Sequence, residues 1–208
     1  MNRRDILSHA CELYLQGGIE AVSMRRLARE LGVTAPALYR HYASREEMLL
    51  DVVSESYRLC AEHLSKALSG RTPAERFDLA GEGYLNFALG HPKFYEMMHA
   101  PAHTLGVEAF PADLMARMDG VGQFFNDRVR ECIESQLLRP LGAQEISLTL
   151  WAHAHGLISI YLRGCLHMDE EAFRLVFHES NRRIMHGMVT PMYESTREHL
   201  LPAPEVVA

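Results

Sequence analysis

Residues 23–45 gather side chains that can bind phosphate groups. Five arginines stand in this stretch against the single acid Glu30, so it carries a formal charge of +4 while the whole chain has a net charge of −6. Arginine, hydroxyl and imidazole groups all donate hydrogen bonds to phosphate oxygens. A solvated helix face can have the same charge, so charge alone does not establish a binding site. The side chains of interest are Ser23, Arg25, Thr34, Tyr39, Arg40, His41 and Arg45.

Two short helices are expected to hold these side chains in place. Ser23 is an expected N-cap, and apolar residues follow it at i, i+3, i+4 and i+7 until Gly32. Thr34 begins the next helix, with Pro36 in its first turn, where a missing N–H costs little. The sequence SREE at 44–47 is a capping box that opens a longer helix. Two short helices joined by a tight turn predict a helix-turn-helix.

The second short helix has the properties of a helix that enters a DNA groove. Its small residues Ala35 and Ala37 permit close approach to bases, and Arg40 can reach a guanine edge or a phosphate. Helix N-termini add backbone N–H groups and a positive dipole end. Arg25 and Arg45 lie in first turns, where a cation is unfavourable to the helix dipole, so phosphate is the partner that would explain them.

The rest of the chain also has helical patterns, with no strand alternation, so we predict an all-α fold: an N-terminal three-helix domain and a C-terminal helical bundle. The first helix is expected over 3–16, ended by Gly17 and Gly18, and the fourth from Ser44 to about Leu68. Residues 100–111 are expected to form a loop. Further helices are expected over 74–90, 92–99, 112–138, 143–166 and 170–196.

Composition narrows the class of protein. The chain has 208 residues, 48% of them hydrophobic, which suffices for a core and argues against a disordered chain. Its four cysteines are far apart and form no CxxC pair, as in a reduced cytosolic protein. We see no signal peptide and no run of about 18 apolar residues. A cytoplasmic location without membrane contact is therefore expected.

Residues 3–50 resemble the DNA-binding domain of the TetR family of bacterial transcriptional repressors. The matching stretches are ILSHACELYLQGGIEAVSMRRLARELGV and TAPALYRHYASREEMLL. The resemblance implies that Ser23, Arg25, Thr34, Tyr39, His41 and Arg45 contact phosphates of operator DNA. It implies that Ala35, Pro36, Ala37 and Arg40 face the bases. Tyr39 and His41 could instead pack within the three-helix core, and Arg29 is expected to be solvated.

The second half resembles the regulatory domain of a TetR subgroup with a Trp-His-Gly pattern, here Trp151, His155 and Gly156. The matching stretches are HPKFYEMMH (91–99) and LWAHAHGLISIYL (150–162). The resemblance implies a homodimer in which the last two helices pair with their copies in a four-helix bundle. Apolar stripes agree with burial there: Leu148, Trp151, His155, Ile158 and Leu162 form one, and Phe173, Phe177, Ile184 and Met188 another.

The family resemblance also implies a pocket for a small-molecule inducer that releases the protein from a pseudo-palindromic operator, and the methionine and aromatic candidates for its lining suggest a hydrophobic ligand. We accordingly place a DNA-binding domain at 1–48, a ligand-binding and dimerisation domain at 49–199 and a disordered tail at 200–208. Ordinary helix-bundle core is the alternative for every pocket residue, and His155 on an apolar stripe suits a core histidine. The candidate pocket residues are Tyr84, Phe87, Met97, Met98, Phe124, Trp151 and His155.

Other classes of function have weaker sequence support. Twelve histidines suggest a metal-sensing regulator as the alternative, with His99 and His103 four residues apart and His153 and His155 two apart. However, Ala100 and Pro101 break the helix that would align the first pair, and the second pair points to different helix faces. The sequence has no HExxH, no paired Glu-x-x-His and no Gly-rich phosphate loop. We expect no catalytic residues, no metal and no cofactor.

Overall fold

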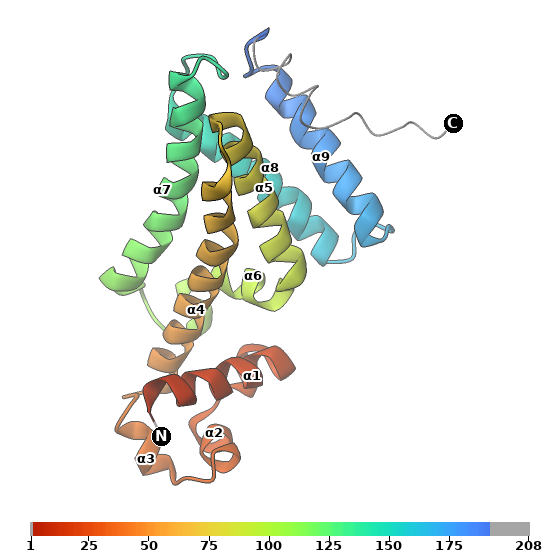
Figure 1. The fold of residues 1–208 in the computed structure, drawn as a ribbon. Coiled ribbons are helices and arrows are strands. Elements are labelled where there is room, and N and C mark those ends of the chain that lie inside the picture. Colours follow the sequence, from red (N-terminus) through yellow and green to blue (C-terminus); the bar gives the residue numbers. More distant parts are fainter. Residues whose placement is uncertain (1, 192–208) are drawn as a thin grey trace. The chain divides into compact units, whose positions relative to one another are not determined.

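Helices form the regular structure of residues 2–191, the part of the chain that this computed structural model describes (Figure 1). Within these residues the extended pairing is an isolated antiparallel bridge between Leu138 and Val189. The predicted all-α fold is confirmed, and the predicted tail at 200–208 lies outside the described residues. The elements are α1 (Arg3–Ala21), α2 (Met24–Glu30), α3 (Ala35–Tyr39), α4 (Arg45–Ser65), the 3₁₀ helix η1 (Lys66–Ser69), α5 (Pro73–Gly90), α6 (Pro92–Met98), η2 (Ala102–Leu105), α7 (Ala112–Glu134), α8 (Ala143–Leu162) and α9 (Glu170–His186).

The described residues divide into two compact units. The first contains residues 2–62 and 87–121, and the second contains residues 63–86 and 122–191. Helices α4, α5 and α7 each contribute to both units. Each unit is built from two separate segments of the chain, whereas the predicted domains were divided by a single boundary after residue 48. The predicted domain limits stay a prediction.

In the first unit, α1, α2, α3 and the start of α4 share one core. The apolar side chains that helical spacing assigned to the inner faces of α1 and α2 are mostly buried, and Leu38 and Tyr42 are fully buried. Helix α6 adds to this unit, because the Tyr14 hydroxyl donates to the carbonyl of Lys93 at 2.6 Å. The Tyr57 hydroxyl likewise donates to the carbonyl of Met98 at 3.0 Å. Core members from the first four helices include Ile6, Ala10, Leu13, Tyr14, Met24, Leu27, Ala28, Met48, Leu49 and Val52.

Several helix ends differ from the prediction. At Gly17 and Gly18 the backbone leaves the helical region, with φ of +69° at Gly18, but one more turn follows as far as Ala21. Because few residues other than glycine adopt a positive φ without strain, the predicted break is real. Helix α3 ends at Tyr39, so five residues separate it from α4, which begins at Arg45, one residue after the predicted start at Ser44. The predicted loop 100–111 contains η2, and α7, α8 and α9 end earlier than predicted, at Glu134, Leu162 and His186.

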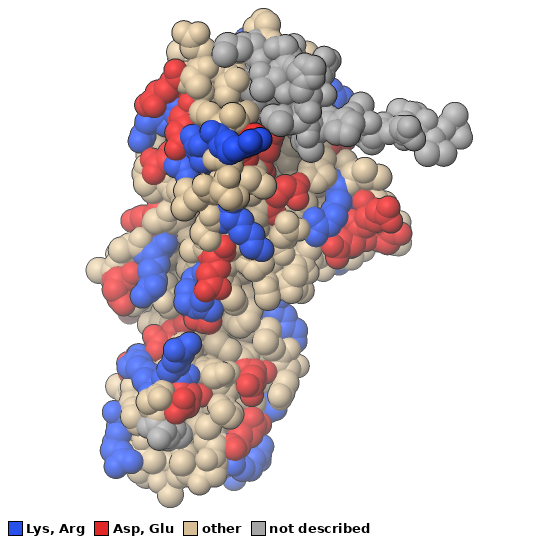
Figure 2. Space-filling model, in the orientation of Figure 1, with Lys and Arg blue, Asp and Glu red and all other residues tan. Residues whose placement is uncertain are grey.

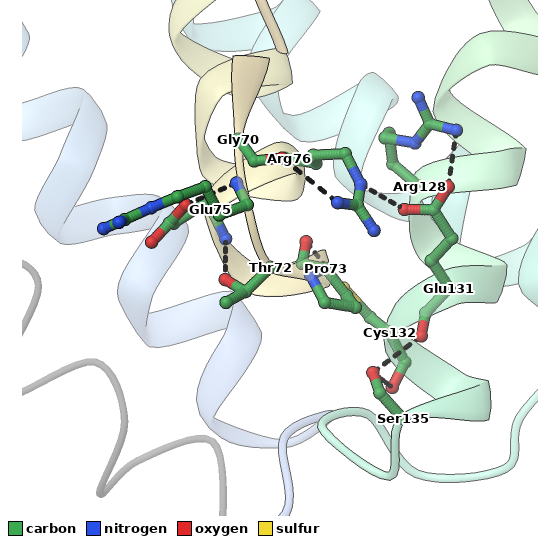
Figure 3. A network of polar contacts seen from close by, with 10 residues as sticks. Gly70, Thr72, Pro73, Glu75, Arg76, Arg128, Glu131, Cys132 and Ser135 are labelled. Atoms are coloured by element: carbon green, nitrogen blue, oxygen red, sulfur yellow. Dashed lines mark hydrogen bonds and ion pairs between the residues drawn. The ribbon is translucent and has the colours of Figure 1, made fainter. Parts of the chain in front are cut away.

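The second unit has an apolar core and a polar network beside it. The core joins α5, α7, α8 and the residues after α9, through side chains that include Ala74, Val129, Ile146 and Val189. At its edge the Glu131 carboxylate accepts from Arg76 at 2.8 Å and from Arg128 at 2.6 Å, and Arg76 also donates to the carbonyl of Gly70 (Figure 3). The network ties α7 to the start of α5.

Helices α8 and α9 pack on each other and still expose large apolar side chains. On the inner side, Phe173 stacks on Tyr161 with ring centroids 4.0 Å apart, and Phe177 is buried. The predicted stripes divide, since Ile158 is buried while Leu148 and Trp151 are exposed. Met185, not Ile184, is the buried residue near the end of α9. The exposed large apolar residues on these helices are Leu148, Trp151, Ile160, Leu175 and Val176.

The surface mixes charges of both signs. On the face shown in Figure 2, basic and acidic side chains form small mixed groups between larger uncharged areas. Ion pairs within one helix include those of Arg58 with Glu55 and Arg182 with Glu179. In residues 2–191, no helix has both the length and the apolar character that crossing a membrane requires.

Candidate nucleic-acid interface

Helices α2 and α3 are held by local contacts that their sequence encodes. The Ser23 side chain accepts from the backbone N–H of Arg26 at 3.2 Å, as predicted for an N-cap. Gly32 has φ of +66° in the turn between the helices, and the N–H of Val33 donates to the carbonyl of Ala28. Thr34 occupies the N-cap position of α3, but its side chain makes no capping hydrogen bond. The predicted helix-turn-helix is therefore present.

Helix α3 buries one side chain and leaves the others accessible. Leu38 is fully buried and anchors the helix on the core of the first unit. Tyr39 is 52% exposed, and Thr34, Pro36 and Arg40 are also exposed. Because these side chains face outward, α3 can enter a groove about 12 Å wide without unfolding its own core. The other predicted contacts on and around this helix are half-buried: Ser23, Ala35, Ala37 and His41.

The start of α4 carries half of the predicted capping box. The Ser44 hydroxyl accepts from the N–H of Glu47 at 3.1 Å. The Glu47 carboxylate reaches back to the N–H of Ala43 at 2.6 Å, one residue before the N–H that a full capping box would use. Both contacts satisfy backbone donors at the beginning of α4, so the helix has a fixed start directly after α3.

An arginine network that the sequence analysis did not predict joins α1 to this corner. The Arg3 guanidinium donates to the carbonyl of His41 at 2.9 Å, pairs with Asp51 at 3.0 Å and with Glu47 at 2.9 Å, and lies over the ring of Tyr42. The Tyr42 hydroxyl donates to Asp51, and burial together with this carboxylate raises the pKa of Tyr42. Arg3 and Asp51 are 48 residues apart, so no local spacing could have indicated the contact.

The five arginines of residues 23–45 do not have the same environment. Arg26 is tied to Glu30 at 3.1 Å and to the Gln16 side chain at 2.8 Å. Arg45 is half-buried and donates to two backbone carbonyls, those of Ile19 and Val22, both at 2.7 Å. Phosphate was the partner expected for Arg45 from its place in a first turn, and these two carbonyls are partners that the sequence did not indicate. The three arginines with exposed side chains are Arg25, Arg29 and Arg40.

The seven predicted pocket residues are divided between the two units. Phe87, Met97 and Met98 are buried in the first unit. In the second unit, Tyr84 is buried with its ring edge-on to Phe125. There too, the Phe124 ring lies under the guanidinium of Arg128 at 4.8 Å.

Trp151 and His155, the remaining pair of pocket residues, stack on each other with ring centroids 5.3 Å apart, and Trp151 is 41% exposed. Burial, reinforced by the nearby Arg163, lowers the pKa of His155. A pocket in the second unit lies between α7 and the start of α8, but polar residues line it and none of the seven does. The role of these residues as a ligand site stays a prediction.

The metal alternative finds no support in the part of the chain that the structure describes. No group of three or more His, Cys, Asp or Glu side chains is arranged there to hold a metal ion. His99 turns to its own helix, where its Nδ1 lies 2.8 Å from the carbonyl of Tyr95, and its ring is against that of Tyr95. Burial lowers the pKa of His153, whose Nε2 has no hydrogen-bond partner among the described residues.

A helix-turn-helix whose second helix has Pro36 and Tyr39 exposed, followed five residues later by a long helix and then by an all-helical second part, defines a DNA-binding regulator fold. Comparison with protein families agrees. Residues 6–52 match the model of the bacterial regulatory proteins of the TetR family, and residues 77–183 match the tetracycline-repressor-like C-terminal domain. The second match alone covers half of the chain, and this chain belongs to the TetR family.

Similarity to individual proteins is more distant. The chain is 33% identical over 89 residues to the HTH-type transcriptional repressor KstR of Mycolicibacterium smegmatis, an alignment that covers 42% of this chain and 40% of KstR. The chain thus spans less than half the length of this relative. It shares its fold with a protein of unknown function from Rhodococcus sp. RHA1, at a TM-score of 0.78 and 24% identity, over 90% of this chain and 95% of the other. AibR in complex with isovaleryl coenzyme A and operator DNA has a TM-score of 0.61 at 20% identity, over 82% and 92%.

Proposed function

We propose that this chain is a transcriptional repressor that binds a pseudo-palindromic operator as a homodimer and is released by a small-molecule inducer. The observation that carries the proposal is the exposed face of α3, anchored by the buried Leu38 and presenting Tyr39 and Arg40 to solvent. A helix presented in this way suits readout of a major groove. Family membership supports it, because the matched families are regulatory proteins with this domain order.

The proposed DNA contacts follow the exposure of the side chains. Arg25, Thr34 and Tyr39 are exposed donors that suit phosphates, and Pro36 and Arg40 are exposed on the face proposed to meet bases. Ser23, Ala35, Ala37 and His41 are half-buried and would contact DNA only at close approach. Phosphate contacts would fix the register of α3, and contacts to base edges would supply specificity.

Selection of bound sequences from random duplex DNA at two salt concentrations tests the central claim. A repressor of this kind should enrich a palindrome whose half-sites lie about one helical turn, or a multiple of it, apart. Recovery of no motif, with binding that only fades as salt rises, would show non-specific contact and contradict the proposal. The enriched duplex then serves as the probe in every experiment below.

The homodimer is supported by the exposed apolar side chains of α8 and α9. Leu148 is 63% exposed and Leu175 is 55% exposed, and large apolar side chains left exposed on two packed helices suit an interaction surface. A twofold four-helix bundle would cover them. Sedimentation equilibrium should give a dimer for the natural chain and a folded monomer for Leu148→Arg. A monomeric natural chain, or a variant that stays dimeric, would remove this surface from the interface.

The inducer is proposed to bind in the C-terminal part of the chain and to be a hydrophobic small molecule. AibR is bound to isovaleryl coenzyme A and operator DNA in its structure, which shows that a protein of this fold can hold both partners. Release requires the ligand to prefer the form that does not bind DNA, because a ligand with equal affinity for both forms shifts nothing. Trp151 is the single tryptophan, so its fluorescence can report binding while thermal unfolding screens a ligand collection. A ligand that raises the unfolding temperature and leaves operator affinity unchanged would not be an inducer.

A further inference from the structure

Arg45 is the first residue of α4, and its guanidinium points back to the end of α1. Its Nε donates to the carbonyl of Val22 and its Nη2 to the carbonyl of Ile19, each at 2.7 Å. Val22 is the C-cap of α1, so both acceptors lie in or directly after the single turn that follows the break at Gly17 and Gly18. The planar fork of a guanidinium can serve two acceptors at once, which an ammonium on a flexible stem does less well.

A second arginine holds the opposite end of α1. Arg3 lies in the first turn of α1 and contacts the carbonyl of His41, just after α3, as well as Glu47 and Asp51 in the first two turns of α4. Both ends of α1 are therefore fastened to the segment that leaves α3 and enters α4. Helices α2 and α3 lie in the chain between these two attachments.

We infer that Arg45 is a positioning residue that fixes the helix-turn-helix on the start of α4, and that it does not act as a phosphate contact. This inference rests on the proposed binding of operator DNA. With the Arg45 contacts intact, α3 keeps one orientation relative to α4, so little conformational freedom is lost when α3 enters the groove. Without them, the fraction of chains with a competent α3 falls, and the apparent affinity falls by the same factor.

Arg25 provides a matched comparison for Arg45. Both are arginines in the first turn of a helix in the same domain, where a cation is unfavourable to the helix dipole. Arg25 is exposed, and among the described residues no carboxylate pairs with it. Arg45 is half-buried with two carbonyl acceptors. Arg25 is therefore expected to contact a phosphate and Arg45 to position the helices, although the sequence alone gives both arginines the same description.

The experiment measures operator affinity against salt concentration for the natural chain, Arg45→Lys, Arg45→Ala, Arg25→Lys and Arg25→Ala. The slope of log K against log salt is negative, and each lost phosphate contact reduces its magnitude by about 0.9 per bound chain. Arg25→Ala should show this decrease, and Arg25→Lys should largely restore it. Arg45→Lys and Arg45→Ala should both bind roughly tenfold more weakly, which corresponds to a loss of about 1.4 kcal/mol. The slope should stay that of the natural chain, because no phosphate contact is lost.

A readout of local motion separates positioning from a general loss of stability. Hydrogen exchange of residues 19–24 and 35–41 should become faster in Arg45→Lys, while exchange in α8 and α9 stays as in the natural chain. Uniformly faster exchange in all helices would make Arg45 a contributor to overall stability and would overturn the inference. If Arg45→Ala fails to fold, Arg45→Lys carries the test, since a phosphate contact predicts affinity close to that of the natural chain.

The remaining outcomes have distinct meanings. Natural affinity in Arg45→Lys together with a lower slope in Arg45→Ala would make Arg45 a phosphate contact and overturn the inference. Natural affinity and slope in both variants would show that the two carbonyl contacts do not matter for binding, which also overturns it. Failure of the natural chain to bind any selected duplex would instead contradict the proposed function, before any Arg45 variant is compared.

Discussion

The helix-turn-helix and the pair α8 and α9 bury their apolar side chains to different degrees. Within residues 2–62 the exposed large apolar side chains are Leu15 and Tyr39, and Tyr39 carries a hydroxyl. On α8 and α9, Leu148, Trp151 and Leu175 are each more than 40% exposed. The first region thus completes its core within one chain. The second leaves apolar surface exposed that a partner could cover.

The two regions also use arginine differently. Around α1, arginines donate to backbone carbonyls at helix ends, as Arg45 does to Val22 and Arg3 to His41. In the second unit, Arg76 and Arg128 share the Glu131 carboxylate, and one backbone carbonyl, that of Gly70, also accepts from Arg76 (Figure 3). Contacts to backbone fix the path of the chain itself, whereas ion pairs between partly exposed side chains contribute about 1 kcal/mol or less. The four predictions below test how far this difference between the regions extends.

The largest effect is expected from Phe173→Ala in the core of the second unit. Phe173 is fully buried, and its ring is stacked on Tyr161 and close to Phe177. Removal of a buried phenylalanine side chain lowers the free energy of unfolding by about 3–5 kcal/mol. Urea unfolding followed by circular dichroism measures the loss. The exposed Glu171→Ala on the same helix is the control and should stay within about 0.5 kcal/mol. A loss below about 1 kcal/mol in Phe173→Ala would show that α9 is not held by this core.

A smaller effect, confined to one operator position, is expected from Arg40→Ala. If Arg40 donates to a base edge, its removal should cost about 1–3 kcal/mol of discrimination at that position and leave other positions unchanged. Competition binding with single-base variants of the selected operator measures it. Arg29→Ala is the control, because Arg29 is exposed on α2 and expected to be solvated. Equal weakening on every duplex would make Arg40 a phosphate contact instead.

The sequence was most informative where chain neighbours also become spatial neighbours. Helical spacing predicted the inner faces of α1 to α3, and the N-cap at Ser23 and the break at Gly17 and Gly18 were found as predicted. Cap and turn residues act within a few positions, so a single sequence contains their signal. The end of α3 has no such local signal, because the helix ends at Tyr39 although Tyr42 is still buried in the core.

The spacing of residues in the sequence could not predict contacts between residues that are far apart in the chain. Nothing near Arg45 in the sequence indicates that Ile19 and Val22 would present carbonyls to it, 26 and 23 residues away. The apolar stripe on α8 was predicted as one face, yet Ile158 is buried and Leu148 is exposed. A hydrophobic side chain gives the same signal whether it faces its own core or a partner. The same holds for the seven candidate pocket residues, because their apolar character did not indicate which of the two units each residue belongs to.

Trp151→Ala should change regulation more than stability. Trp151 is 41% exposed, so its removal leaves no closed cavity, and the free energy of unfolding should fall by less than about 1 kcal/mol. Operator affinity should be close to that of the natural chain, while release by an inducer found in the ligand screen should be blunted. Fluorescence anisotropy of labelled operator, titrated with inducer, measures both. Full inducibility would exclude Trp151 from the ligand site, and dissociation into monomers would assign it to the dimer surface instead.

The smallest effect is expected at the pair that links α5 to α9, where His178 Nε2 lies 3.0 Å from the Glu82 carboxylate. This hydrogen bond, with Arg174 nearby, lowers the pKa of Glu82 below its ordinary value of 4.5. The folded state therefore binds fewer protons than the unfolded state, so the pair stabilises the fold above pH 4.5 and its contribution disappears as pH falls through the folded-state pKa.

Glu82→Gln should be less stable than the natural chain by less than about 1 kcal/mol near pH 6, because the pair is half-exposed. The difference should shrink toward zero as pH falls through the folded-state pKa, because the carboxyl then becomes protonated in both states. Urea unfolding at several pH values measures it, with the exposed Glu171→Gln as control. A difference that grows as the solution is acidified would have the wrong sign for a lowered pKa. It would show that Glu82 is not held as a carboxylate by α9, and that this ion pair does not join the two helices in solution.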